Sequence, residues 1–154
     1  MEASHGTWGK HSFRMSENGN LLEMTAGQVV PDIKANGSDG PLSISKTSAL
    51  SLAITLDAGT VAGQDVEWWV LLQTPAAAPN TWWSWTQATN SWRVGLYPAS
   101  QGALTSISTP LQVWSGASGL TPGAYIFYLC VDLDRNGVPD TIVFADSVSV
   151  TVTN

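Results

Sequence analysis

The chain contains little cysteine and little charge, and basic residues are its scarcest charged class. Its 154 residues include one cysteine, six lysines or arginines and twelve aspartates or glutamates. A single cysteine, Cys130, excludes an internal disulfide, a CxxC redox pair and a cysteine zinc site. The net charge of −6 and the scattered bases give no electrostatic support for binding a nucleic-acid backbone. We therefore expect no nucleic-acid partner.

Long apolar runs and helical periodicity are also missing. No apolar run reaches about 18 residues, so we expect no membrane span. The first residues, Met1 to His5, carry neither a basic nor an apolar stretch, which predicts no signal peptide in the chain as given. No window shows the apolar period of about 3.6 residues that an amphipathic helix needs. The sequence thus argues against helical and membrane-spanning classes.

From residue 27 onward the pattern is that of short β-strands separated by turns. Leucine and isoleucine alternate with small or polar residues over 50–56, which is the period of a half-buried strand. The stretch 66–74 is apolar on both faces, as expected of a central strand. Further strands are expected at 111–115, 123–132 and 147–152. Short strands at this spacing predict an all-β sandwich.

The first 26 residues differ in composition and pattern from the rest of the chain. They contain both histidines and a turn cluster at 16–20, flanked by strand-like segments at 7–15 and 21–25. Asn-Gly between apolar segments is a hairpin signal. We therefore divide the chain into an N-terminal strand or hairpin extension at 1–26 and a β-sandwich at 27–154.

One local pattern sharpens the fold class. The segment Leu120-Thr121-Pro122-Gly123-Ala124-Tyr125 begins a strand in which Tyr125, Phe127, Leu129 and Val131 share a face. A tyrosine just after a Pro-Gly turn resembles the tyrosine corner of immunoglobulin-like sandwiches. The segment is similar to the corresponding part of PKD-type and bacterial immunoglobulin-like modules of secreted bacterial proteins. That resemblance implies an immunoglobulin-like antiparallel β-sandwich whose tyrosine hydroxyl bonds to backbone upstream, and it brings no catalytic motif.

The segment 132–140 carries a calcium-loop pattern. Its sequence, DLDRNGVPD, matches D-x-D-x-N-G-x-x-D, in which oxygen ligands at alternate positions curl around a hard cation. Gly137 permits the sharp turn. Since strands are expected on both sides, the loop resembles those of dockerins and thrombospondin type 3 repeats. The predicted Ca²⁺ ligands are the side chains of Asp132, Asp134 and Asn136, the carbonyl of Val138, and Asp140 directly or through water.

The calcium pattern is incomplete. Position twelve, where an EF-hand has a bidentate Glu, is Val143. Asp146 or a distant residue would have to complete the shell, and we expect weak binding of about 10⁻⁴–10⁻³ M. The alternative is a polar turn whose Asp and Asn side chains bond to local backbone. The same turn chemistry explains a second acidic segment at 32–39, and the alternative is that this segment binds calcium or completes the first site from across the sandwich.

Six of the eight tryptophans lie within residues 68–92. Trp68 and Trp69 are adjacent on a strand and must face opposite sides, so we expect only one in the core. Aromatic rings that stack on sugars would make a carbohydrate-binding surface, and the alternative is packing in the core or at an interface. The candidate ligand-binding residues are Trp82, Trp83, Trp85 and Trp92.

No pattern in the sequence is typical of an enzyme. It lacks G-x-S-x-G, HExxH, P-loop and GxGxxG motifs. Asp65 and Glu67 share a strand face and could mimic a glycosidase pair, but exposed acids at the start of a strand are more typical of a solvated edge. Cys130 alternates away from the core face and is interpreted as a buried, unreactive thiol. We expect no catalysis.

These patterns lead to one functional interpretation and one alternative. We expect a secreted or cell-surface module with a structural or adhesive role, for example in a filament or matrix, stiffened by calcium at 132–140. In that interpretation residues 1–26 add a strand to the sheet edge of another copy. The alternative is a carbohydrate-binding module whose partner is a polysaccharide.

Overall fold

The computed structural model describes residues 13–15, 21–23, 28–78, 81–139 and 142–154. Their secondary structure is β-strand apart from one short 3-10 turn, η2 (Gly59–Val61). The strands are β1 (Phe13–Met15), β2 (Leu21–Glu23), β3 (Val30–Ala35), β4 (Leu42–Ser45), β5 (Ala49–Asp57), β6 (Asp65–Gln73), β7 (Trp82–Thr86), β8 (Ser91–Val94), β9 (Ser100–Ala103), β10 (Ile107–Ala117), β11 (Gly123–Asp132) and β12 (Ile142–Thr153).

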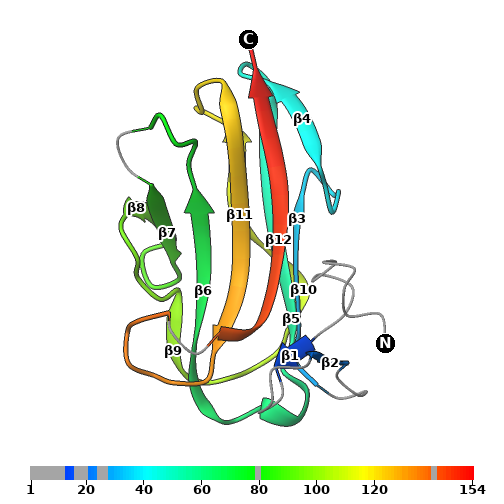
Figure 1. Ribbon diagram of the computed structural model, residues 1–154, viewed down its shortest axis with the longest axis vertical. Coiled ribbons are helices and arrows are strands. Elements are labelled where there is room, and N and C mark those ends of the chain that lie inside the picture. The colour runs from blue at the N-terminus through cyan, green and yellow to red at the C-terminus, as the bar shows by residue number, and fades with distance from the viewer. Residues whose placement is uncertain (1–12, 16–20, 24–27, 79–80, 140–141) are drawn as a thin grey trace.

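Strands β3 to β12 form two sheets packed face to face, which confirms the predicted all-β sandwich (Figure 1). One sheet has three strands in the order β10-β5-β3. The other has seven, in the order β4-β12-β11-β6-β7-β8, with β9 also paired to β6. The larger sheet is mixed rather than purely antiparallel, because β12 and β4 run parallel. The expected N-terminal hairpin is present as the antiparallel pair of β1 and β2.

The core lies between the two sheets and follows the period of the strands. In β5 the alternating Leu and Ile side chains point inward and are almost fully buried. In β11 the buried face carries Tyr125, Phe127, Leu129 and Val131, as predicted. The hydroxyl of Tyr125 donates a hydrogen bond to the carbonyl oxygen of Thr121 at 2.7 Å, so the predicted upstream bond is confirmed. No helix in these segments is long and apolar enough to cross a membrane.

Strand β6 is buried on both of its faces. Trp68 lies in the main core, whereas Trp69 faces the opposite side and packs in a second cluster with Leu71 and Cys130. Only Trp68 lies in the core between the sheets, as predicted, but Trp69 is buried as well and has no exposed surface. The outer face of the larger sheet therefore has an apolar layer of its own.

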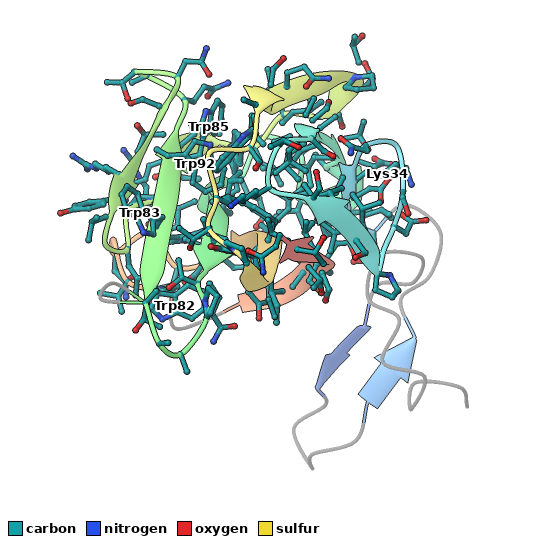
Figure 2. All side chains as sticks on the ribbon, turned by 90° about the horizontal axis from the view of Figure 1, so that it is seen from above. Lys34, Trp82, Trp83, Trp85 and Trp92 are labelled. Carbon is teal, nitrogen blue, oxygen red and sulfur yellow. The ribbon has the colours of Figure 1, made fainter. Side chains whose placement is uncertain are left out.

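The two long edges of the sandwich differ. We call the side where β3 packs against β12 the closed edge. We call the opposite side, where β10 faces β7 and β8, the open edge. Figure 2 shows the labelled tryptophans on the side of the open edge and Lys34, which belongs to β3, on the other side.

Candidate functional site

A pocket of about 740 Å³ lies between the sheets at the open edge. Three tryptophans from three strands line it: Trp83 from β7, Trp92 from β8 and Trp114 from β10. Each is partly buried and packs against the main core. Around them the lining is completed by Leu72, Thr74, Ala78, Asn90, Gln112, Val113, Ser115, Ser118, Gly119, Leu120, Thr121 and Tyr125.

The aromatic rings form a connected wall. The ring centroids of Trp92 and Trp114 are 5.5 Å apart, and the two ring planes are inclined by 58°. Both rings meet Phe127 of β11 edge-on, at 6.1 Å and 5.8 Å. Such offset and edge-to-face pairs are the favoured arrangements of aromatic side chains. The wall is therefore held by packing on the core rather than standing free in solvent.

A hydrogen bond fixes Trp92 across the open edge. Its indole Nε1 donates to the carbonyl oxygen of Val113 at 2.7 Å, which joins β8 of the larger sheet to β10 of the smaller sheet. The indole N–H is thereby satisfied, and the ring is locked in one orientation.

A β-bulge places Trp114 in the pocket. In the pairing of β10 with β5, Gln112 lies opposite Ala53 and Trp114 lies opposite Leu52, so one strand advances by two residues while the other advances by one. A bulge of this kind redirects the side chains that follow it. Strict alternation would place Trp114 on the face of Gln112, but the bulge places it opposite inward-facing Leu52. Sequence analysis did not single out Trp114, since a bulge leaves no signal in the alternation.

The four predicted tryptophans do not form one surface. Trp83 and Trp85 share a face of β7 and Trp82 lies on the other, as their strand positions predict. Only Trp83 and Trp92 line the pocket. Trp85 is 2% exposed and packs against Trp68 with ring centroids 6.2 Å apart, which makes it a core residue.

Trp82 belongs to the outer face of the larger sheet. Its ring lies 5.9 Å from that of Tyr128, next to the second cluster. It is half-buried like Trp83 but lies outside the pocket lining. Trp82 and Trp83 therefore form a natural pair for comparison, with one ring on each side of the same strand.

Polar groups accompany the rings of the pocket. Asn90 lines the wall, and its Oδ1 accepts a hydrogen bond from Trp85 Nε1 at 3.1 Å, which leaves its amide nitrogen with two donors. Ser115 and Thr121 contribute hydroxyls that both donate and accept. A mostly apolar pocket with a few placed polar groups is the usual form of a small-molecule site.

The loop that follows β11 is held by its own polar side chains. Asp132 Oδ1 accepts from the backbone N–H of Asp134 at 2.8 Å, and Asn136 Oδ1 accepts from that of Val138 at 2.9 Å. Asn136 Nδ2 also donates to Asp134 Oδ2 at 3.2 Å. Gly137 adopts a φ of +78°, the left-handed conformation expected at the sharp turn. These are the local turn bonds that Asp and Asn provide.

Glu67 anchors this loop from beneath. It lies directly opposite Asp132 in the pairing of β6 with β11, and its Oε1 accepts from the backbone N–H of Gly137 at 3.0 Å and from Gln101 Nε2 at 2.8 Å. Glu67 has no exposed surface, so the interpretation of it as a solvated acid was wrong. The signal in the sequence was a charged residue within an otherwise apolar central strand. Asp65 is exposed and forms an ion pair with Arg135 at 3.0 Å.

The loop offers part of a calcium shell. Glu67 Oε2 is buried without a hydrogen-bond partner, and Asp132, directly opposite, is also fully buried, so two hard oxygen donors meet under the loop. Within the described ranges, however, no three His, Cys, Asp or Glu side chains are grouped so that they could hold a metal ion. Asp140 lies outside these ranges. Calcium binding by this loop stays a prediction.

Asp146 lies away from the loop. Its side chain is 5% exposed and points to β3, where Oδ2 accepts from the backbone N–H of Ile33 at 2.8 Å. Oδ1 accepts from the N–H of Ser147 at 2.8 Å. The structure therefore places Asp146 at the closed edge, where both of its carboxylate oxygens accept backbone N–H groups.

Cys130 is buried and unpaired, as predicted. Burial, and after it the charges of Asp146 and Asp132, raise the pKa of its thiol to about 12. A thiol with such a pKa stays protonated and is a poor nucleophile.

Comparison of the chain with protein-family models, with curated proteins and with solved structures finds no match. The argument for a function therefore depends on the pocket and its chemistry.

Proposed function

We propose that the protein is a non-catalytic, secreted or cell-surface module that binds a saccharide in the pocket at the open edge. The observation that carries the proposal is the convergence of Trp83, Trp92 and Trp114 on a single pocket of about 740 Å³. The structural or adhesive role through residues 1–26 stays a prediction, because most of that segment lies outside the described residues.

The chemistry of the lining favours a sugar over a purely apolar ligand. The face of an indole ring carries partial negative charge, which suits the slightly positive C–H groups on the flat side of a pyranose. The hydroxyls at the edge of that sugar ring need donors and acceptors, and Asn90, Ser115 and Thr121 supply both. Among the described residues that line the pocket there is no lysine, arginine, aspartate or glutamate, which favours a neutral saccharide.

Binding measurements on two matched variants test this proposal. The probes are cellulose, chitin, xylan and peptidoglycan, with retention on the insoluble form and tryptophan fluorescence on soluble fragments as the readouts. We expect at least one probe to be retained and to change the fluorescence. Trp83→Ala should weaken that binding by about tenfold or more, since loss of a central aromatic contact costs more than about 1.4 kcal/mol.

Trp82→Ala is the control, because it removes a half-buried tryptophan from the same strand but on the other side of the sheet. It should bind as the unchanged protein does. The proposal fails if none of the four polysaccharides binds, or if both variants lose binding equally while their circular dichroism shows them folded.

A further inference from the structure

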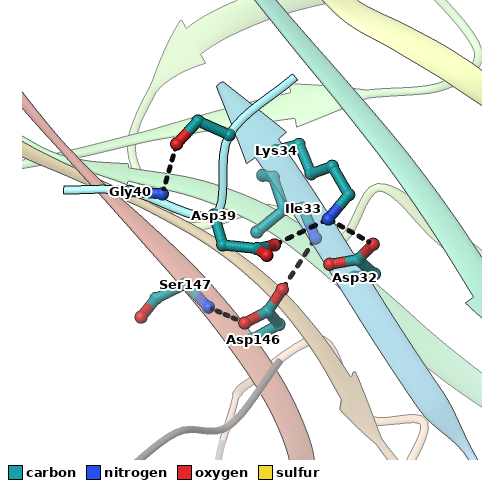
Figure 3. Close-up of polar contacts among 8 residues, drawn as sticks. Asp32, Ile33, Lys34, Asp39, Gly40, Asp146 and Ser147 are labelled. Atoms are coloured by element: carbon teal, nitrogen blue, oxygen red, sulfur yellow. Dashed lines mark hydrogen bonds and ion pairs between the residues drawn. The ribbon is translucent and has the colours of Figure 1, made fainter. Parts of the chain in front are cut away.

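Two carboxylates from opposite sheets meet at the closed edge. Asp32 belongs to β3 of the smaller sheet and Asp146 to β12 of the larger sheet. Figure 3 shows the two carboxylates side by side, and a side-chain hydrogen bond with Asp32 is one of the causes that raise the pKa of Asp146. Asp146 also accepts the N–H of Ile33, on the side of β3 where no strand of the described residues is paired with it. The carboxylate of Asp146 thus accepts a backbone N–H of β3 as the carbonyl of a neighbouring strand would.

The charges around the pair do not balance. Lys34 Nζ lies 3.3 Å from Asp32 Oδ2 and 2.7 Å from Asp39 Oδ1, so one ammonium serves two carboxylates and Asp146 is a third. Cys130 of β11 also interacts with Asp146, but its protonated thiol supplies no positive charge. In the described structure, the charged or titratable groups that face Asp146 are therefore Asp32 and Lys34 of β3, Asp39 of the turn after β3, and Cys130 of β11.

One oxygen of the pair lacks a donor. Asp32 Oδ1 is buried and has no hydrogen-bond partner among the described residues. Both oxygens of Asp146 already accept backbone N–H groups. A buried acceptor without a donor is costly, and two adjacent carboxylates repel each other unless a proton lies between them. A proton on Asp32 Oδ1 would satisfy that atom and donate to Asp146 without disturbing either backbone bond.

We propose that Asp32 and Asp146 share one proton and form a pH-dependent clasp that holds the closed edge together. When the proton is present, the pair makes a carboxyl–carboxylate hydrogen bond between the sheets. When it leaves, the buried charge of Asp146 faces the partly buried charge of Asp32, and Lys34 is shared between Asp32 and Asp39. The proton belongs to the pair rather than to either residue.

The direction of the pH effect follows from Asp146. Burial is the largest cause that raises the pKa of Asp146, and the charge and hydrogen bond of Asp32 raise it further. The backbone N–H groups of Ile33 and Ser147 lower it. The raising causes are the stronger, and the pKa is about 6. An acid with a raised pKa in the folded state stabilises that state most below its unfolded value, about pH 4. The stabilisation is lost as the pH rises through about 6. The clasp is therefore closed in acid and weakened at neutral pH.

The variant Asp32→Asn imitates the protonated pair, because its amide nitrogen can donate to Asp146 at any pH while its oxygen still faces Lys34. We expect its melting temperature to equal that of the unchanged protein at pH 4.5 and to exceed it at pH 7 by roughly 3–8 °C. At pH 7 the amide hydrogen of Ile33, which donates to Asp146, should also exchange more slowly with solvent in Asp32→Asn than in the unchanged protein. Asp65→Asn is the control, since it removes one equal charge from an exposed site and should show no such pH-dependent difference.

Two results would overturn the proposal. One is a folded Asp32→Asn variant whose melting temperature runs parallel to that of the unchanged protein from pH 4.5 to 7. The other needs no variant: side-chain carboxyl resonances of Asp32 and Asp146 that both finish titrating below pH 4.5. A coupled titration of the two resonances near pH 6 supports the clasp.

Discussion

The two edges of the sandwich are closed in different ways. At the closed edge β3 lies against β12, and a buried carboxylate accepts a backbone N–H that has no strand partner. At the open edge bulky rings stand between β10 and the pair β7–β8, and the direct bond between the sheets is the one from Trp92 to Val113. Short polar groups allow close approach, whereas large aromatic rings hold the sheets apart and leave a pocket. Both edges hold the sheets together, but only the open edge leaves room for the pocket in which we propose that a saccharide binds.

The largest expected effect comes from breaking the open edge. Trp92→Ala removes the hydrogen bond to Val113 and the ring contacts with Trp114 and Phe127. We expect a loss of about 3 kcal/mol in the free energy of unfolding, as is typical of a large aromatic truncation. Denaturation in urea measures it.

Trp92→Phe keeps an aromatic ring but loses the N–H donor and part of the indole, so it should cost less than Trp92→Ala. It should cost about 1 kcal/mol. A stability unchanged by Trp92→Ala would show that Trp92 does not hold the sheets together at the open edge. The Asp32→Asn experiment addresses the closed edge in the same way, with a smaller and pH-dependent effect.

Much of the fold was predictable, because most of its strands have a local sequence pattern that identifies them. Alternation predicted β5 and β11, and the Pro-Gly-x-Tyr segment predicted the bond from Tyr125 to Thr121. The positions of Trp83 and Trp85 on one face follow from strand geometry alone.

The pocket and the clasp were less predictable, because they depend on contacts distant in sequence. Trp114 enters the pocket through a bulge that alternation cannot show. Glu67 is buried because a loop 70 residues away donates Gly137 N–H to it. Asp146 meets β3 because the sheets pack there, and its bond to Ile33 spans 113 residues. Local pattern decides which strands form, but packing between the sheets decides which side chains meet.

The smallest expected effect concerns the 132–140 loop, which belongs to neither edge. If the loop binds calcium at about 10⁻³–10⁻⁴ M, a few millimolar calcium should stabilise the protein by about 1–2 kcal/mol, or by roughly 2–6 °C in melting temperature. Calorimetry with calcium and with a chelator measures this. Glu67→Gln should reduce the calcium effect, because it replaces the orphaned carboxylate oxygen by an amide group. Equal melting temperatures with calcium and with chelator would contradict calcium binding, and the loop would then be a polar turn.

The most direct test of the proposed saccharide site is a titration followed through the indole N–H resonances. The account predicts that a soluble oligosaccharide derived from the retained polysaccharide shifts the signals of Trp83, Trp92 and Trp114 together and in a saturable way. The signals of Trp69 and Trp82, which lie on the outer face of the larger sheet, should stay in place. Shifts confined to the outer-face tryptophans, or no shift at any indole, would contradict it.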